Sequence, residues 1–370
     1  MNVRKRVIYI KRFSFKRMFK ALFGILSIPF SFISIIEILH IKEIIGDMWI
    51  KLLGIDQEAG PYYGLTILAN KWKHSDVIMW ILFFTFLFLI IAQIICFLYE
   101  NRLERILLIE HSSLNKMYFK ISRECRDSYI IVPYKLDQYT TFNSNLPLEE
   151  KLNVAISELG NHADKINDKI RKGKYWAGYA GIANIPMTFM LGFELGDENR
   201  KLLFHKYHGR KTSAKLKDDS FYLLKEDERR FVFKDEIIKK SDIEKKGKLL
   251  LLIELTQPIR EADYKVIQEE NDYIIKFHIA DTINYDIVDS SNQIDEYTDE
   301  ILDWVAENQK NPNIVQIKIC IAASSAFIFA LGMKFSKTQN KETVIFHYEK
   351  DTYPWGVNVH KRIPVIIKEI

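Results

Sequence analysis

The sequence predicts an α/β fold built from two related halves, preceded by two transmembrane helices. Three features lead to this prediction. A sequence pattern occurs twice in the second half of the chain, the apolar spacing around each copy follows the order strand, helix, strand, and two long apolar runs lie near the amino terminus.

The repeated pattern consists of an isoleucine-alanine pair, a leucine-glycine pair and a phenylalanine-histidine pair. These pairs are Ile182-Ala183, Leu191-Gly192 and Phe204-His205 in the first copy, and Ile321-Ala322, Leu331-Gly332 and Phe346-His347 in the second. A short apolar run enters each copy and a segment with helical spacing follows, which predicts strand, helix, strand twice. We therefore expect two half-domains that share a pocket, where the carboxyl ends of parallel strands and the amino ends of helices converge.

The apolar runs cover residues 21–41 and 77–99. Each is close to the roughly 20 residues that a helix needs to cross the hydrocarbon core of a bilayer. Their polar members are Glu37 and His40 in the first run and Gln93 in the second. Basic residues without any acidic residue precede the first run, so we expect both termini in the cytoplasm. A cleavable signal peptide is the alternative, but the run is longer than the usual apolar core of such a peptide.

The predicted division of the chain has four parts. Residues 1–20 form a basic cytoplasmic segment, 21–99 a two-helix transmembrane module, 100–146 a linker or stalk, and 147–370 a globular domain. In the linker, a three-and-four spacing predicts a helix that runs out of the second span, carried by Leu103, Leu107, Leu114, Met117 and Ile121. This helix either transmits motion or is a solvated stalk. A loop rich in Pro, Asn and Ser at 133–147 marks the boundary.

Within the globular domain, the spacing predicts the elements of two halves. The first half has a helix at 147–171, a strand at 174–183, a helix at 185–195 and a strand at 202–207. The second half has a strand at 249–255 whose continuous aliphatic run is typical of burial on both faces. It continues with a strand at 273–279, a helix at 294–308 and the strand, helix and strand of the second copy.

Charge and cysteine content limit the classes of partner. The formal net charge is +5, and the surplus comes from the first 20 residues, so the part after residue 99 is nearly neutral. Proteins that bind nucleic-acid polymers usually carry a basic face, so we expect a short ligand and no polymer. The cysteines Cys96, Cys125 and Cys320 lie far apart, and we interpret them as reduced and structural.

The repeated motifs carry a resemblance to a known family. The residues 179–186, the pairs Leu191-Gly192 and Leu331-Gly332, the segment 321–326, and the ending His347-Tyr348-Glu349 with Tyr353-Pro354-Trp355 are similar to the SAVED domain. The resemblance covers residues 147–370. It implies two fused CARF-like, Rossmann-related halves that sense a cyclic di- or trinucleotide made by a CD-NTase synthase. With two spans ahead, the chain resembles transmembrane SAVED effectors of bacterial CBASS anti-phage defence. That implies a location in the bacterial inner membrane.

A cyclic oligonucleotide offers flat bases, which stack on aromatic rings, and phosphodiesters, which bind N–H groups and cations. The first candidates are Tyr175, Trp176 and Tyr179, followed by Gly181, where a missing side chain would let a ligand come close. Aromatic residues that alternate along a strand are as often core, and this alternative stays open.

The remaining candidates follow predicted strands. Ser324 and Ser325 occupy the strand-to-helix turn of the second copy, where Ser324 either contacts a phosphate or caps the helix. Arg210 and Lys211 either pair with phosphate or form a solvated basic turn. Thr256 and Gln257 end the central strand, and Tyr353 and Trp355 are expected after the last strand.

Catalytic motifs are missing from the sequence, including the phosphate-binding loop, the zinc motif of metalloproteases and the nucleophile elbow. Gln316-Ile317-Lys318 faintly resembles the closing triplet of a metal-dependent nuclease, but its alternation is typical of a strand. His205 and His208 lie three residues apart without an acidic or thiol partner nearby in sequence. For these two and for His347 we expect surface or core histidines without a metal. We expect no cofactor and no enzymatic activity.

The hypothesis joins the two modules. Ligand binding leads the chain to assemble with copies of itself, and the spans then disrupt the membrane. Two helices per chain cannot enclose a pore, so a homo-oligomer is required, with Glu37, His40 or Gln93 facing its interior. The alternatives are a membrane-anchored nucleotide-processing enzyme, such as a ring nuclease, and a scaffold without a ligand.

Overall fold

The computed structural model describes residues 104–116, 119–121, 123–197, 200–206, 220–224, 226, 232–242, 244–279 and 287–367. The predicted spans at 21–41 and 77–99, with Glu37, His40 and Gln93, lie outside these residues. None of the described helices is long and apolar enough to cross a membrane. The fold described below belongs to the unit that runs from Glu104 to Ile370.

The first half is a six-stranded sheet in the order β2-β6-β5-β4-β1-β3. Its strands β3, β1, β4 and β5 run parallel, and β6 pairs antiparallel with β5. The elements are β1 (Arg105–Ser112), β2 (Lys120–Ile121), α5 (Arg123–Ser128), β3 (Ile130–Asp137), α6 (Tyr139–Phe142), α7 (Leu148–Gly173), β4 (Trp176–Ile182), α8 (Ile185–Leu195), β5 (Lys201–Lys206) and β6 (Ser220–Leu223).

The second half is a seven-stranded sheet in the order β13-β12-β11-β10-β8-β9-β7. Strands β9, β8, β10 and β11 run parallel, and the strands at both edges are antiparallel. The elements are β7 (Phe233–Lys239), β8 (Gly247–Glu254), α9 (Glu261–Tyr264), β9 (Tyr273–Ile279), α10 (Ser291–Asn308), β10 (Ile314–Ala322), α11 (Ser325–Lys334), β11 (Thr343–Glu349), β12 (Thr352–Asn358) and β13 (Ile363–Ile366).

The two halves share one topology, as the repeated pattern predicts. The order β3-β1-β4-β5-β6 in the first sheet corresponds to β9-β8-β10-β11-β12 in the second, and every pairing has the same direction. Helices α7 and α8 correspond to α10 and α11. The predicted strands and helices of both copies are confirmed, including the helix at 185–195.

The predicted stalk helix is wrong. Arg105–Ser112 forms β1, the strand that lies between β3 and β4 in the first sheet. Residues 106–109 are all buried, because this Ile-Leu-Leu-Ile run occupies both faces of a central parallel strand. The spacing of Leu103, Leu107 and Leu114 matched a helix only by coincidence. The predicted loop at 133–147 is also wrong in part, because it contains the end of β3 and α6. The fold of the first half therefore starts at β1 and not at residue 147.

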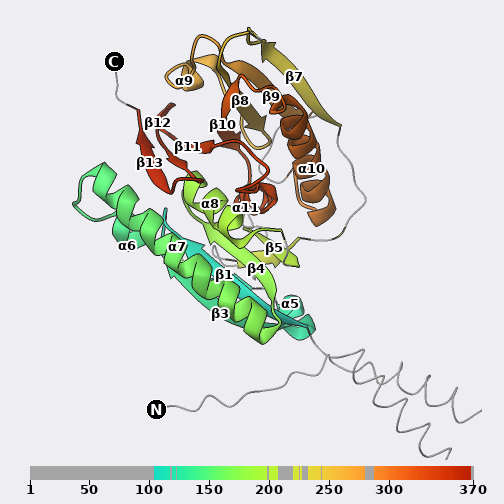
Figure 1. The fold of residues 1–370 in the computed structure, drawn as a ribbon. Helices are drawn as coiled ribbons and strands as arrows, with labels where there is room; N and C mark the ends of the chain where they lie inside the picture. The colour runs from blue at the N-terminus through green and yellow to red at the C-terminus, as the bar shows by residue number, and fades with distance from the viewer. Residues whose placement is uncertain are drawn as a thin grey trace, which may run out of the picture. The chain divides into compact units, whose positions relative to one another are not determined.

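The two halves pack through α8 and α11, which lie between the two sheets (Figure 1). A Cβ on Gly192 would lie 2.2 Å from the carbonyl oxygen of Phe329, and a Cβ on Gly332 would lie 2.2 Å from that of Phe189. Each glycine of the repeated leucine-glycine pair therefore allows the backbone of the other helix to approach. One hydrophobic core, which includes residues of α8 and α11, runs through both halves.

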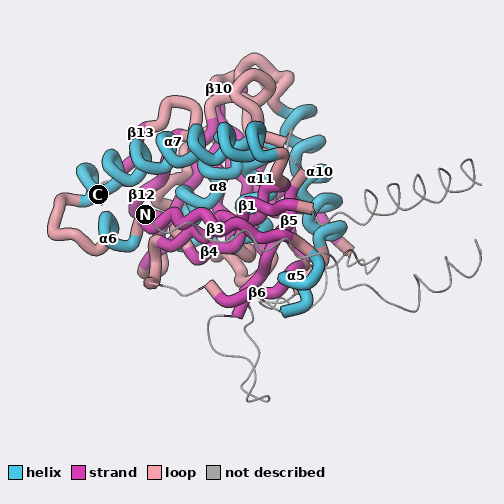
Figure 2. Tube along the Cα trace, turned by 90° about the horizontal axis from the view of Figure 1, so that it is seen from below, coloured by secondary structure: helices cyan, strands magenta, loops and turns pink. Residues whose placement is uncertain are grey.

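Helix α7 covers the first sheet on the same side as α8 (Figure 2). Its buried residues recur every three or four positions: Leu152, Ala155, Ile156, Leu159, Gly160, Ala163, Ile166 and Ile170. This apolar face matches the predicted helix at 147–171. The helix ends where Lys174 adopts a left-handed conformation with φ of 50°. Smaller clusters pack on the far face of each sheet, one of them with α9.

Candidate ligand-binding edge

The carboxyl ends of the central strands of both halves lie on one side of the molecule. The Ser325 hydroxyl at the start of α11 donates to the carbonyl oxygen of Gly181 near the end of β4, at 2.7 Å. At the other end of α11, Lys334 lines a cavity with Trp176 from the start of β4. Helix α11 therefore runs opposite to β4, and the amino ends of α8 and α11 share the side that we call the carboxyl edge.

Two matching pairs of turns form the carboxyl edge. In the first half, the N–H groups of Ser113 and Leu114 donate to the carbonyl oxygen of Ile182 at 3.2 and 3.4 Å. In the second half, those of Leu255 and Thr256 donate to Ala322, both at 2.9 Å. Each turn thus bonds the end of one central strand to the end of the neighbouring strand, which is followed by a helix. The sequence repeat predicts this equivalence.

The second-half turn contains four predicted site residues. Ser324 caps α11, because its side chain accepts a hydrogen bond from the N–H of Phe327 at 3.3 Å. Ser325 makes the contact with Gly181. Thr256 and Ser324 are half-buried, and Gln257 is exposed. The structure brings Thr256, Gln257, Ser324 and Ser325 to one edge, where they remain candidates for ligand contacts.

Tyr179 is a core residue and leaves the set of candidates. Its side chain is completely buried, and its ring stacks on Phe329 at a centroid distance of 4.2 Å. Its hydroxyl donates to Thr188 Oγ1 at 3.3 Å, and burial raises its pKa. Gly181 is also buried, and a Cβ there would lie 2.4 Å from the Tyr179 hydroxyl. The glycine therefore makes room for a tyrosine and not for a ligand.

Tyr353 and Trp355 are wrong as site residues for the same reason. They lie within β12 and not after the last strand, and their exposed fractions are 1% and 3%. Trp355 packs against His347 at a centroid distance of 4.6 Å, and Tyr353 packs against Tyr348 at 5.3 Å. A base cannot reach these rings.

Tyr175 and Trp176 are half-buried, but they lie at the start of β4, on the side away from the carboxyl edge. Trp176 faces the guanidinium of Arg200, whose central carbon lies 5.2 Å from the ring centroid. Arg210 and Lys211 follow β5 and lie outside the described residues. Their predicted roles stay predictions.

The sequence reasoning missed Ser113, Asn184 and Lys116. Ser113 is buried, and its hydroxyl oxygen accepts the N–H of Asn184 at 2.7 Å, which fixes the entrance of α8. Lys116 is exposed, with its ammonium 5.9 Å from the ring centroid of Tyr139. It adds an exposed positive charge three residues after the turn at Ser113, and helix amino ends such as that of α8 favour anions. Lys116 falls in the segment that the sequence predicts as a stalk, and no motif there indicates a functional role.

A buried polar network lies directly below this edge. His111 Nε2 is 3.1 Å from the amide oxygen of Gln138, and the Gln138 amide nitrogen donates to the Ala155 carbonyl oxygen at 2.7 Å. The other ring nitrogen of His111 lies 3.4 Å from the Tyr179 hydroxyl. Burial lowers the pKa of His111 to about 4, so the imidazole is neutral at pH 7. The network connects the end of β1 with the middle of β4 and with α7.

The described residues contain no cluster of His, Cys, Asp or Glu that could hold a metal ion. His205 and His347 are buried in the sheets, and His208 lies outside the described residues. Lys318 is also buried, and its ammonium donates to the Ile267 carbonyl oxygen at 2.7 Å and to Asp272 at 3.0 Å. Within this part of the chain, the Gln316-Ile317-Lys318 triplet is part of the packing.

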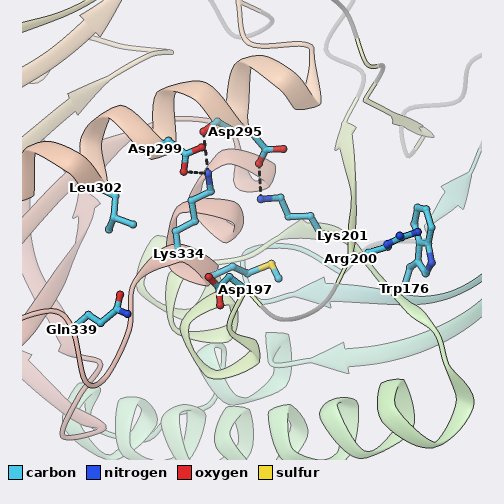
Figure 3. A pocket seen from close by; sticks show the side chains of 10 residues that line it. Trp176, Asp197, Arg200, Lys201, Asp295, Asp299, Leu302, Lys334 and Gln339 are labelled. Atoms are coloured by element: carbon cyan, nitrogen blue, oxygen red, sulfur yellow. Dashed lines mark hydrogen bonds and ion pairs between the residues drawn. The ribbon is translucent and has the colours of Figure 1, made fainter. Parts of the chain in front are cut away.

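The side opposite the carboxyl edge contains two cavities, of about 500 and about 540 Å³. Both are lined by Trp176, Lys201 and Asp295, and Figure 3 shows the first of them. Lys201 belongs to the first half and Asp295 to the second, so the cavities lie between the halves. We call this side the amino edge, because the parallel strands begin there.

Comparison with known families gives a match to one family model. Residues 159–359 match the family model described as SAVED, the SMODS-associated and fused to various effectors sensor domain. The chain belongs to the SAVED family. No curated protein matches the chain.

Solved structures of SAVED proteins are also similar. The Acinetobacter baumannii Cap4 SAVED/CARF-domain containing receptor with the cyclic trinucleotide 2'3'3'-cAAA is 16% identical, with a TM-score of 0.45 over 71% of this chain and 54% of that chain. The Moraxella osloensis Cap4 SAVED/CARF-domain containing receptor is 15% identical, with a TM-score of 0.41 over 70% of this chain and 51% of that chain. The chain thus spans about half the length of these structures.

The SAVED match begins inside α7, but the SAVED fold of this chain includes earlier strands. Strands β1 and β3 correspond to β8 and β9 of the second half. They supply Ser113 and the His111 network, so the carboxyl edge of the SAVED fold depends on residues before 159.

Proposed function

We propose that this chain is a membrane-anchored sensor of anti-phage defence. It binds a cyclic di- or trinucleotide at the carboxyl edge of its SAVED fold, assembles with copies of itself and disrupts the bacterial inner membrane. The observation that carries the proposal is the pair of equivalent turns, Ser113-Leu114 and Leu255-Thr256, beside the amino ends of α8 and α11 in a chain of the SAVED family.

The edge suits a ring of phosphodiesters. Two helix amino ends and the exposed ammonium of Lys116 favour anions, and two equivalent turns match a ligand made of repeated nucleotide units. Gln257 is exposed beside them. The guanidinium of Arg260 is paired with Asp263 and Asp351, at 3.0 and 2.9 Å.

Calorimetric titration of the full-length protein in lipid nanodiscs tests this function. The titrants are cyclic dinucleotides and trinucleotides of defined base composition and linkage, and the ligand is recovered afterwards for chromatography. We expect saturable binding of at least one compound and its recovery intact. A linear product would instead identify a ring nuclease, and no binding by any compound would identify a scaffold.

The membrane step has its own readout. In liposomes loaded with a fluorescent dye, the binding compound should release the dye, and the release should depend steeply on protein density because an oligomer is required. Spans at 21–41 and 77–99 are part of the proposal. Ligand binding without any dye release would contradict membrane disruption and leave the sensor role intact.

A further inference from the structure

The two helices that begin at the carboxyl edge have different amino ends. Asn184 and Ser324 are equivalent residues, since each precedes its glycine, Gly192 or Gly332, by eight positions. The Ser324 side chain caps α11. The Asn184 side chain makes no such bond to α8, although asparagine is as good a cap as serine. The duplication therefore repeats the position of this residue but not its hydrogen bond.

The first turn of α8 contains N–H groups without an acceptor among the described residues. Thr188 is the first residue of this helix whose N–H is bonded there, to the carbonyl oxygen of Asn184 at 3.0 Å. Pro186 is the second residue of the helix and has no N–H. The N–H groups of Ile185 and Met187 therefore remain as donors at a helix end that favours anions.

The side chain of Asn184 is buried without a partner. The residue is 3% exposed, and its amide forms no hydrogen bond with any described residue. Neither atom of the amide is fully enclosed, so the small exposed part of this residue includes the amide. The backbone N–H of Asn184 is bound by Ser113, which places the residue between that turn and the first turn of α8. A polar group that is buried and unpaired lowers stability, so its presence here needs another explanation.

The groups around this amide are mainly donors. The Ser113 hydroxyl accepts the Asn184 N–H at 2.7 Å, and no described acceptor takes its own proton. Lys116 adds an exposed ammonium three residues later. Asp137, an acidic residue of the same edge, already accepts the Tyr139 N–H at 3.0 Å. A phosphodiester has acceptor oxygens and a negative charge, so it is the part of a cyclic oligonucleotide that matches these donors.

We infer that Asn184 contacts a phosphodiester of the ligand, and that its amide N–H donates to a phosphate oxygen at the amino end of α8. This inference rests on the proposed function, because it names a residue of the same site. The N–H group of Met187 lies in the same turn and supplies a second donor. Ser324 uses its side chain to cap its own helix, whereas the side chain of Asn184 is available to the ligand.

The first test measures affinity and thermal unfolding in full-length variants, with the compound of the cyclic oligonucleotide panel that binds the natural protein most tightly. Asn184→Asp keeps the size of the side chain but replaces its donors by a negative charge. It should unfold at a temperature at least as high as the natural protein, because a carboxylate stabilises a helix amino end. Its affinity should nevertheless fall about tenfold or more, the effect of losing a hydrogen bond to a charged group. Asn184→Ala, which adds no charge, should also lose about tenfold.

The matched control is Asn292→Asp. Asn292 is exposed in the first turn of α10, which Ser290 already caps, and it lines a cavity of the amino edge. The control makes the same change of charge at another helix amino end, so its affinity should stay within about twofold of the natural protein. Natural affinity in both Asn184 variants overturns the inference. An equal loss in Asn292→Asp and Asn184→Asp also overturns it, because the effect would then come from charge alone.

The second test uses inorganic phosphate and needs no cyclic oligonucleotide. Millimolar phosphate should raise the unfolding temperature of the natural protein above its value in chloride of equal ionic strength. Asn292→Asp should show the same increase, and Asn184→Asp a smaller one. If no compound of the panel binds the natural protein, the proposed function is contradicted and this comparison alone decides on Asn184. An equal increase in all three proteins then overturns the phosphate contact.

Discussion

At the scale of single residues, burial separates the predicted site residues into core residues and residues that remain candidates. The sequence predicts Tyr179 as a ring that stacks on a base and Tyr353 and Trp355 as residues after the last strand, and all three are core. The small polar residues Thr256, Gln257, Ser324 and Ser325 are predicted by their place after strands, and all four lie at the carboxyl edge. A position relative to a strand end is fixed by topology, but the burial of an aromatic residue depends on distant segments such as Phe329.

The histidine below the edge makes a pH-dependent contribution to stability. Burial lowers the pKa of His111 from 6.5 to about 4. Between these values the unfolded chain binds a proton that the folded chain does not, so the free energy of unfolding decreases as pH falls from 6.5 to 4. The contribution lost over this window is about 3 kcal/mol.

The comparison of natural protein and His111→Gln in urea unfolding at pH 7 and pH 4.5 measures this contribution. The variant should lose less stability on acidification. His347, whose pKa burial also lowers to about 4, is present in both proteins and cancels. Equal losses in the two proteins would show that His111 is protonated in the fold.

At the scale of secondary-structure elements, the glycines of the helix pair are the most sensitive positions. Gly192→Ala should destabilise the protein by about 1–3 kcal/mol, because its Cβ would lie 2.2 Å from the Phe329 carbonyl oxygen. Gly160→Ala in α7 is the matched control, since its nearest neighbour is the end of the Arg362 side chain at 3.4 Å. The control should be neutral or gain up to about 1 kcal/mol from helix propensity. Thermal unfolding that gives both variants the same stability would contradict the close contact of α8 and α11.

Two substitutions of Ser324 distinguish its two predicted roles, the cap of α11 and a contact with phosphate. Ser324→Ala removes the acceptor for the Phe327 N–H and should cost about 1 kcal/mol of stability. Ser324→Asp restores the cap, but it places a negative charge where phosphodiesters are proposed to bind. Normal stability together with weaker ligand binding is therefore the expected result for the aspartate variant, from unfolding and calorimetry. Unchanged affinity would place the phosphates away from this turn.

The elements were predictable where spacing was unambiguous. The repeated pattern gave both copies of strand, helix and strand, and the aliphatic run at 249–255 gave the central strand β8. Strand β1 has the same kind of aliphatic run at residues 106–109. This run is short and follows a predicted span, so the spacing of the leucines around it predicts a helix instead. The edge strand β7 exposes most of its residues, and no apolar alternation marks it in the sequence.

At the scale of the whole molecule, duplication brings equivalent features of the two halves to the one edge where we propose that the ligand binds. Equivalent turns, helix amino ends and a shared core place both sets of strand ends on the same side. The duplication predicts this convergence from the sequence. It does not predict the cavities of the amino edge, because these arise where the second copy departs from the first.

Hydrogen–deuterium exchange of the full-length protein, with and without the cyclic oligonucleotide that it binds, tests the location of the site most directly. We predict slower exchange in the ligand-bound protein at residues 112–116, 255–258 and 323–328, and no protection at residues 200–201 on the amino edge. Protection confined to the amino edge, with the three turns unchanged, would contradict the account.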